Sequence, residues 1–421
     1  MAAVLALLLA IAVTVQVPAD AVVRRVLDAP SIRTAFAELD RTHDQLIADT
    51  IALTEIPAPP FDEHARARAF MSMLEHAGLT SVQQDTQGNV IGVRRGTDSR
   101  LPVVVIAAHL DTVFPAGTDV RVRREGTRLR APGIGDNARS LAVLAAIARA
   151  MHAATIRTDA DVLFVGTVGE EGAGDLSGVR YLFDAGDWRG RIGTFIAVDG
   201  TGPGDHIVDA GIGIRRYRVT FTGPGGHSFG SFGIVNPAFA LGSAIERLSR
   251  VPVPASPKTT FNVGVIGGGT SVNTIPSAVW TDIDLRSESA AGLDRLDRDF
   301  RAAIQAAADE ENRRRSIELG KVIVRFERTG DRPAARTPAS SRLIATAEAI
   351  IRASGMRPTR SAASTDANIP MSLGIPAITI ESGATGDRVH TLDEWIDVEK
   401  SASLGGVQNA LALLIAMAGR P

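Results

Sequence analysis

The stretch VVVIAAHLDTVFPAG, residues 103–117, decides the fold. Residues 103–108 are apolar and mostly β-branched, which is typical of a buried strand in a parallel sheet. This run ends abruptly at His109, Leu110 and Asp111. Ligands gather at the carboxyl ends of strands in open α/β sheets. We therefore expect His109 to bind a metal there and Asp111 to orient it.

Two later apolar strands also end in acidic residues. Residues 161–167 are followed by Glu170 and Glu171, and residues 194–198 are followed by Asp199. Two adjacent carboxylates repel each other, so one of them usually needs a cation or a proton. Glycines flank the Glu170–Glu171 pair, which suits a close approach to a ligand.

Two further candidates lie outside these strand ends. Asp136 directly precedes a long alanine-rich helix, so its carboxylate suits a helix N-cap as well as a bridge between metals. His390 follows the apolar strand of residues 375–380. Two imidazoles and three carboxylates can hold two divalent ions about 3.5–4 Å apart and leave another carboxylate as general base. Because the chain has no cysteine, a metal here must use nitrogen and oxygen ligands. Such ligands suit zinc, and cobalt or manganese could substitute.

The chain predicts two domains, one inserted into the other. Residues 22–212 and 329–421 alternate strands and helices, which indicates an α/β domain with a mostly parallel sheet. Residues 213–328 follow the order strand, helix, strand, strand, helix, strand of a ferredoxin-like α+β domain. Its glycine-rich loops carry His227 and Asn273, as loops that serve a site do.

The N-terminus carries a short apolar segment. Residues 2–18 suit the core of a signal peptide, and Ala19-Asp20-Ala21 offers a small-x-small cleavage site. The first arginine is Arg24, so the basic residues that open a signal peptide are missing, and residues 1–21 could instead be an anchor or a helix of the fold. We expect export to the periplasm or the exterior, with a cytoplasmic or membrane-anchored protein as the alternatives.

Two classes of function are disfavoured. A net charge of −2 without a basic stripe argues against nucleic-acid binding. A nucleotide-binding protein would need a glycine fingerprint after the first long strand, where His109-Leu110-Asp111 stands instead.

Six motifs occur in a recognisable order: HLDTV at His109, GDN at Asp136, GEEG at Glu170, VDG at Asp199, GGHS at His227, and the late His390. From residue 40 onward the chain resembles the M20 family of metallopeptidases and amidohydrolases, which includes glutamate carboxypeptidase, tripeptide aminopeptidase and acetylornithine deacetylase. The resemblance implies a zinc-peptidase-like catalytic domain and an inserted dimerisation domain that also closes as a lid.

The resemblance also implies a role for each metal ligand. His109 and Asp199 would hold one zinc, Glu171 and His390 the other, and Asp136 would bridge the two ions. A bridging hydroxide would attack the amide carbonyl, and the metals would stabilise the oxyanion.

The remaining roles that the resemblance implies concern proton transfer and the substrate. Glu170 would act as general base and then protonate the leaving amine, while Asp111 would orient His109. His227 would contact the oxyanion, usually from the partner subunit. Asn273 and Arg286 would bind substrate, with Arg286 able to clamp a carboxylate. Ser364 and Thr365 belong to a small-residue loop near the substrate.

One departure blurs the subfamily. Asp136 is followed by Asn137-Ala138-Arg139-Ser140, where many members have Asp and then Lys-Gly. We expect a homodimeric di-zinc hydrolase that cleaves amide bonds of small peptides. The alternative is an N-acyl-amino-acid deacylase with the same metal chemistry. A non-catalytic peptide-binding relative would lack Glu170 or a metal ligand, yet all of these residues are present.

Overall fold

The computed structural model describes residues 18–421. The predicted signal-peptide core lies almost wholly outside these residues. The predicted cleavage site, Ala19-Asp20-Ala21, falls at the start of helix α1 (Ala19–Asp28). Val22, Val23 and Val26 of this helix are buried in the core, so α1 is packed as part of the fold.

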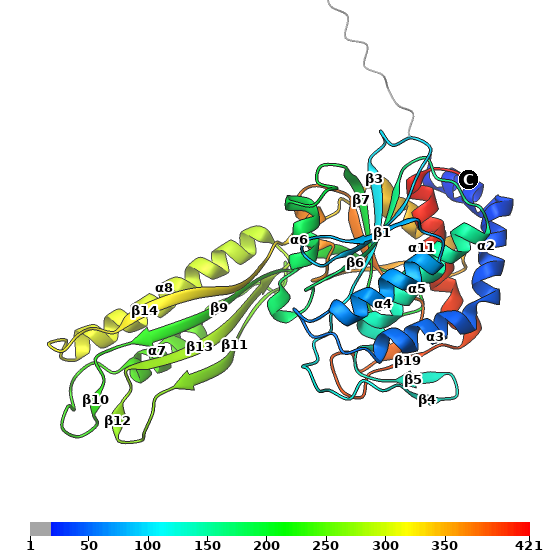
Figure 1. Cartoon of the computed structure of the whole chain (residues 1–421). Coiled ribbons are helices and arrows are strands. Elements are labelled where there is room, and N and C mark those ends of the chain that lie inside the picture. Colours follow the sequence, from blue (N-terminus) through cyan, green and yellow to red (C-terminus); the bar gives the residue numbers. More distant parts are fainter. Residues whose placement is uncertain (1–17) are drawn as a thin grey trace, which may run out of the picture.

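A mixed sheet forms the centre of the larger domain (Figure 1). Its strands follow the order β1-β2-β6-β3-β7-β17-β8-β15, and β16 pairs with β8. The central strands β6, β3, β7 and β17 are parallel to one another, whereas the pairs toward both edges are mainly antiparallel. The strands are β1 (Ser81–Gln84), β2 (Val90–Arg94), β3 (Val103–His109), β6 (Val162–Thr167), β7 (Ile192–Val198), β8 (His206–Gly211), β15 (Ala335–Arg336), β16 (Thr359–Ala363) and β17 (Ala377–Ile380).

Helices cover both faces of this sheet. One face packs against α1, α2 (Pro30–Arg41), α3 (His43–Thr54), α4 (His64–His76), α5 (Arg139–Ala153), α9 (Arg342–Ala353) and α11 (Lys400–Ala418). The other face packs against α6 (Ser177–Asp184) and α10 (Asn368–Ser372). The sequence of β3 is apolar along residues 103–108 because successive side chains alternate between the cores on the two faces of the sheet.

Among the described residues, helix α11 is the one helix long and apolar enough to cross a membrane. Most of its side chains are buried against the sheet and the neighbouring helices, which accounts for its apolar composition.

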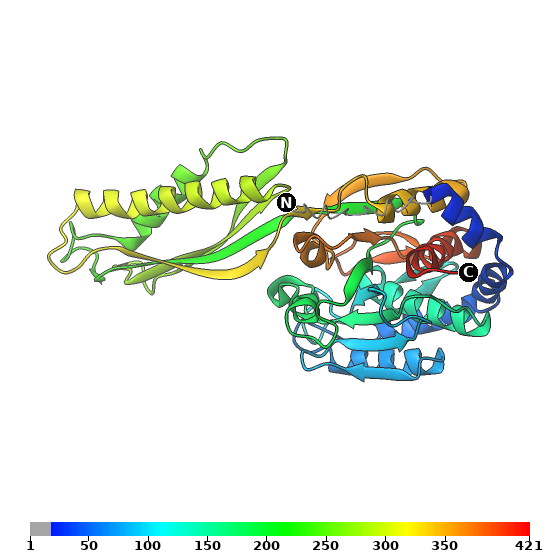
Figure 2. The same ribbon diagram turned by 90° about the horizontal axis from the view of Figure 1, so that it is seen from above.

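The inserted domain extends from this body as an arm (Figures 1 and 2). Its sheet has the order β11-β13-β9-β14, and α7 and α8 cover one face, as α8 does in Figure 2. Short strands β10 and β12 pair near the far end. The elements are β9 (Gly213–Thr222), β10 (Gly226–His227), α7 (Pro237–Leu248), β11 (Thr259–Gly268), β12 (Thr274–Ile275), β13 (Ala278–Ser287), α8 (Ala290–Arg314) and β14 (Ile323–Arg332). The predicted α/β class with an inserted ferredoxin-like domain is confirmed.

A further small sheet has the order β18-β19-β5-β4. It brings together chain segments far apart in sequence: β4 (Arg123–Glu125), β5 (Arg128–Arg130), β18 (Thr385–Asp387) and β19 (Trp395–Asp397). The loop between β18 and β19 carries His390.

Candidate active site

Three neighbouring parallel strands position the first group of site residues. The order β6-β3-β7 brings the carboxyl ends of these strands side by side. His109 ends β3, Glu170 and Glu171 follow β6, and Asp199 follows β7. The predicted strand-end residues therefore meet at one edge of the sheet.

Two residues from other segments of the larger domain, Asp136 and His390, complete two candidate ligand groups. Asp136 lies in the segment Ile134–Ala138 that precedes α5, where its own backbone is not helical, and His390 lies in the β18–β19 loop. In each group the candidate ligand atoms lie within 4.8 Å of one another. The first group is His109, Asp136 and Asp199, and the second is Asp136, Glu171 and His390. A further set, His109, Glu170 and Glu171, meets the same distance criterion without Asp136.

The two carboxylate oxygens of Asp136 face different imidazoles. Asp136 Oδ1 lies 2.8 Å from His109 Nε2, and Asp136 Oδ2 lies 3.0 Å from His390 Nε2. Asp199 Oδ1 is 3.7 Å from His109 Nε2, and Glu171 Oε1 is 3.1 Å from His390 Nε2. This geometry is that of a shared carboxylate between two ligand groups.

Asp111 contacts His109 and the backbone of the loop that carries Glu170 and Glu171. The Nδ1 atom of His109 lies 3.0 Å from the Asp111 backbone oxygen and 3.4 Å from its carboxylate, which leaves Nε2 free to face Asp136. The Asp111 carboxylate also accepts the backbone N–H groups of Glu170 at 3.0 Å and Glu171 at 2.7 Å. Asp111 thus orients the imidazole and the acidic loop together.

The neighbouring carboxylates favour positive charge on the two imidazoles of this cluster. Burial lowers the pKa of His109, but hydrogen bonds to Asp111, Asp136 and Asp199 raise it well above the ordinary value. Hydrogen bonds to Asp136 and Glu171 raise the pKa of His390 to about 10. The carboxylates hold a positive charge on each imidazole, and divalent ions would take the place of those protons.

The donor set fits a pair of metal ions. It offers imidazole nitrogens and carboxylate oxygens, the ligands of zinc sites in chains without cysteine. The buried Asp136 Oδ1 lies 2.8 Å from His109 Nε2 and has no other polar partner among the described residues. Once Nε2 of His109 gives up its proton, this nitrogen and the Asp136 oxygen can both bind a common cation.

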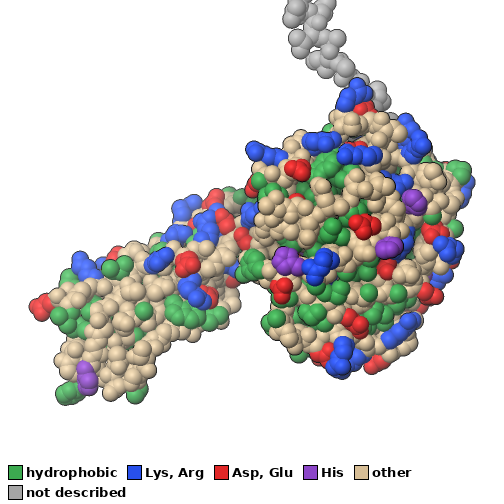
Figure 3. Space-filling model, in the orientation of Figure 1, with side chains coloured by type: hydrophobic (Ala, Val, Ile, Leu, Met, Phe, Trp, Pro, Cys, Tyr) green, Lys and Arg blue, Asp and Glu red, His purple; other side chains and the backbone are tan. Residues whose placement is uncertain are grey.

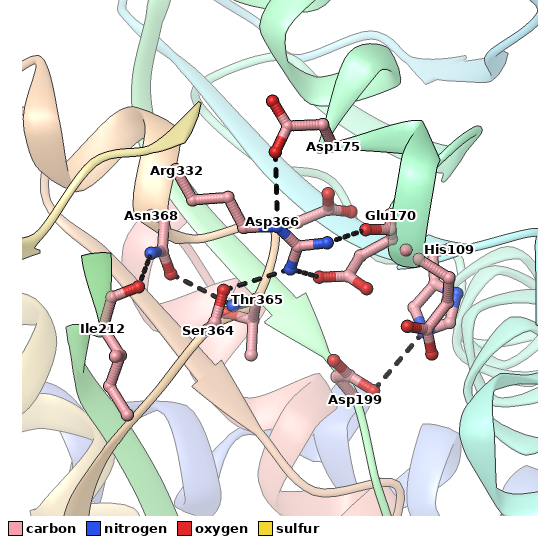
Figure 4. A network of polar contacts seen from close by, with 12 residues as sticks. His109, Glu170, Asp175, Asp199, Ile212, Arg332, Ser364, Thr365, Asp366 and Asn368 are labelled. Carbon is pink, nitrogen blue, oxygen red and sulfur yellow. Dashed lines mark hydrogen bonds and ion pairs between the residues drawn. The ribbon is translucent and has the colours of Figure 1, made fainter. Parts of the chain in front are cut away.

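Glu170 lies beside the metal groups but has a different partner. Its Oε1 is 3.0 Å from Nη1 of Arg332, and both side chains are almost fully buried (Figure 4). Burial raises the pKa of Glu170 well above its usual value, while the positive charge of Arg332 opposes this shift. The sequence reasoning missed Arg332, because it ends β14 without belonging to any motif.

Glu394 is a second residue that the sequence reasoning missed. Its buried carboxylate accepts the backbone N–H groups of Gly133 at 2.9 Å, Gly135 at 2.7 Å and Asp136 at 2.9 Å. Burial raises the pKa of Glu394 to about 7. Glu394 therefore holds the turn that presents Asp136, and it lies in the same loop as His390. Its only signal in the sequence is that proximity.

The predicted residues of the inserted domain lie apart from this cluster. His227 is exposed in β10 near the far end of the arm, where its Nδ1 accepts N–H groups of Phe229 and Gly230 at 3.2 Å. Asn273 lies beside it, since its backbone oxygen accepts the N–H of Ser228 at 2.9 Å. Arg286 pairs with Asp284 at 2.6 Å on the arm.

The two loop residues predicted near the substrate point in different directions. Ser364 Oγ lies 3.0 Å from Nη1 of Arg332 and so faces Glu170 (Figure 4). The Thr365 hydroxyl instead lies 2.7 Å from the hydroxyl of Thr379 in β17. Thr365 is buried and is thus engaged in packing the loop onto the sheet.

Comparison with known proteins places the chain in a family. The model of peptidase family M20/M25/M40 matches residues 105–415, which include the metal-ligand candidates and the inserted domain. The chain belongs to this family. Membership places it among peptidases and amidohydrolases, and the resemblance inferred from the motifs is confirmed.

Two relatives illustrate the range of this family. The chain is 29% identical over 286 residues to a probable carboxypeptidase of Aspergillus clavatus, covering 63% of this chain and 61% of the relative. It is 30% identical over 271 residues to acetylornithine deacetylase of Myxococcus xanthus, covering 59% of this chain and 65% of the relative. The alignments thus span about three fifths of each relative's length.

A solved structure shares the whole fold. A dinuclear metal-binding M20 peptidase of Bacillus subtilis superposes with a TM-score of 0.66 at 16% identity. The alignment covers 90% of this chain and 99% of that one. At this identity the likeness speaks for the fold alone.

Proposed function

We propose that the protein is a co-catalytic two-metal hydrolase that cleaves amide bonds of small peptides. The observation that carries the proposal is the pair of ligand groups that share Asp136 and lie beside the buried carboxylate of Glu170. One carboxylate between two ions and a second carboxylate free for proton transfer is the arrangement that metal-assisted hydrolysis requires.

The two ligand groups would each hold one metal. His109, Asp136 and Asp199 form one group, and Asp136, Glu171 and His390 form the other. Zinc suits these ligands best, and cobalt or manganese could substitute. Bound metals supply a Lewis acid for the amide carbonyl and lower the pKa of water to near neutrality.

Glu170 provides the proton transfer in this proposal. Its carboxylate takes a proton from the attacking water as the water oxygen bonds to the amide carbon. It then gives that proton to the nitrogen as the carbon–nitrogen bond breaks. Asp111 keeps Glu170 and Glu171 in register, because its two oxygens accept their backbone N–H groups.

The proposal includes a homodimer formed by the inserted domain. His227 lies on the arm and not beside Glu170 of its own chain, so a second copy is the source of a histidine that contacts the oxyanion. The edge strand β11 exposes Val265 and Ile266, which a partner arm would cover. Asn273 and Arg286, also on the arm, would bind the ends of the substrate.

An N-acyl-amino-acid deacylase is the second candidate function. The similarity to an acetylornithine deacetylase favours it, since that relative is named for an acyl substrate. Both functions use the same ligand groups and differ in the pocket that receives the substrate. For either one we propose export to the periplasm or the exterior, where peptides can be scavenged.

Amine release from a substrate panel tests the proposal. The panel contains dipeptides, tripeptides, N-acetyl amino acids and N-succinyl amino acids, each with zinc-loaded and chelated protein. We expect metal-dependent cleavage of peptides, and the order of product release then gives the terminus recognised. Cleavage of acyl amino acids alone would assign the deacylase function. If the protein binds two zinc ions but turns over none of the panel, it would be assigned as a non-catalytic, peptide-binding relative.

A further inference from the structure

Arg332 connects the inserted domain to the carboxylate of Glu170. It is the last residue of β14, the strand by which the chain leaves the arm, and it pairs in register with Ile214 of β9, the strand by which the chain enters. Arg332 is only 4% exposed although it lies at this junction. Figure 3 shows charged side chains of both signs gathered where the arm joins the body.

The guanidinium of Arg332 has partners on two loops of the catalytic domain. Nη1 lies 3.0 Å from Glu170 Oε1 and 3.0 Å from Ser364 Oγ, while Nη2 donates to the backbone oxygen of Glu170 (Figure 4). Nε faces Asp175 Oδ1 at 3.7 Å. A planar fork of donors thus fixes both the side chain and the backbone of Glu170.

The two strands that join the arm to the body, β9 and β14, make further contacts with the loop that carries Glu170. The Asp331 N–H donates to the Asp175 carboxylate at 3.1 Å, and Arg180 donates to the backbone oxygens of Asp175 and Asp331. From β9, Arg216 Nη1 donates to the Gly172 backbone oxygen at 3.0 Å. Rotation of the arm about its two connecting strands therefore moves groups that hold the segment from Glu170 to Asp175.

We infer that Arg332 is a positioning residue that couples the orientation of the inserted domain to the placement of the Glu170 carboxylate. This inference rests on the proposed function of Glu170 and deepens it. Arg332 contacts no member of the two ligand groups that share Asp136, and its partner near them is Glu170, so we place its action on Glu170. The arm thereby sets the reactivity of the site through the strand that joins it to the body.

Steady-state kinetics of Arg332→Gln test this inference. We expect kcat to fall by about 10- to 100-fold with little change in KM, because the fork that places Glu170 is lost while the metal ligands are untouched. Arg332→Lys, which keeps the charge but not the fork, should restore only part of kcat. Arg325→Gln, an exposed position on the same strand, is the matched control and should behave as wild type.

Asp175→Asn tests whether contacts between β14 and the Glu170 loop, and not only the Arg332–Glu170 ion pair, place the Glu170 carboxylate. Asp175 does not touch Glu170, and its backbone φ of 51° is one that asparagine accepts readily. We expect Asp175→Asn to lower kcat, and the double variant with Arg332→Gln to lose no more than the latter alone. Strictly additive losses, or wild-type kcat in Asp175→Asn, would overturn the coupling.

Measurements of metal content and folding distinguish a loss of positioning from a loss of metal or of structure. Metal analysis and melting temperature are measured for every variant, and Arg332→Lys decides the question if Arg332→Gln does not fold. Wild-type kcat in Arg332→Lys and Arg332→Gln would overturn the role of Arg332. If the wild-type protein turns over none of the substrate panel, the proposed function fails before any variant is compared.

Discussion

Asp136 is the residue on which the candidate site depends. Its two oxygens face His109 and His390, which come from strand β3 and from a loop near the C-terminus. The sequence placed Asp136 before a helix but left two interpretations open, a helix cap or a bridging carboxylate. The structure gives its side chain no role in capping α5.

At the same scale, Glu170→Gln separates catalysis from metal binding. Glutamine keeps the size of the side chain but cannot take a proton from water. We expect full metal content and a loss of activity of about 10²- to 10⁴-fold. Turnover near the wild-type rate would show that another group is the base.

Glu394→Ala tests the second residue that supports Asp136. Removal of its carboxylate leaves three backbone N–H groups of the Asp136 turn without their partner. We expect the free energy of unfolding to fall by about 1–3 kcal/mol and metal affinity to weaken about 10- to 100-fold. Chemical denaturation and metal titration measure the two effects, and unchanged metal affinity would contradict the role.

At the scale of elements, the sequence predicted most of what positions the site. Apolar runs that end in His109, Glu170 and Asp199 indicated parallel strands, and the observed order β6-β3-β7 brings those ends together. Arg332 and Glu394 could not be predicted in this way. Each acts through contacts between segments more than 150 residues apart, and neither residue type nor local pattern specifies such pairings.

Helix α5 supports the site by packing under the sheet, and Leu144→Ala tests this. Leu144 is fully buried within the core of that helix. Truncation leaves a cavity, so we expect a loss of about 2–5 kcal/mol in the free energy of unfolding. Leu373→Ala, at a side chain that is 54% exposed, is the control and should change stability by less than about 0.5 kcal/mol. Equal effects would contradict the assigned packing.

At the scale of the whole molecule, the arm separates two parts of the proposed machinery. Glu170 lies in the body, whereas His227 lies near the far end of the inserted domain. The sequence predicted the insertion from the change in element order, but it could not show how far His227 lies from the site of its own chain. That separation is the reason for proposing a second copy as its destination.

Mixing two inactive variants tests this arrangement. Glu170→Gln and His227→Ala each lack one group, and a mixed dimer contains one site with both. After subunit exchange at equal concentrations we expect about a quarter of the wild-type activity, since half of the dimers are mixed and one of their two sites is complete. Each variant alone is the control. No recovery in proven mixed dimers would contradict the role of His227 in the partner's site.

The most direct test of the central claim is the number of metal ions bound per chain in the wild type and in Asp136→Ala. Both are dialysed against zinc, freed of excess metal and measured by elemental analysis beside a folding control by circular dichroism. The shared carboxylate predicts two ions per wild-type chain and close to none in the variant, with activity following metal content. A folded wild type that holds no zinc, or a variant that retains both ions, would contradict the account.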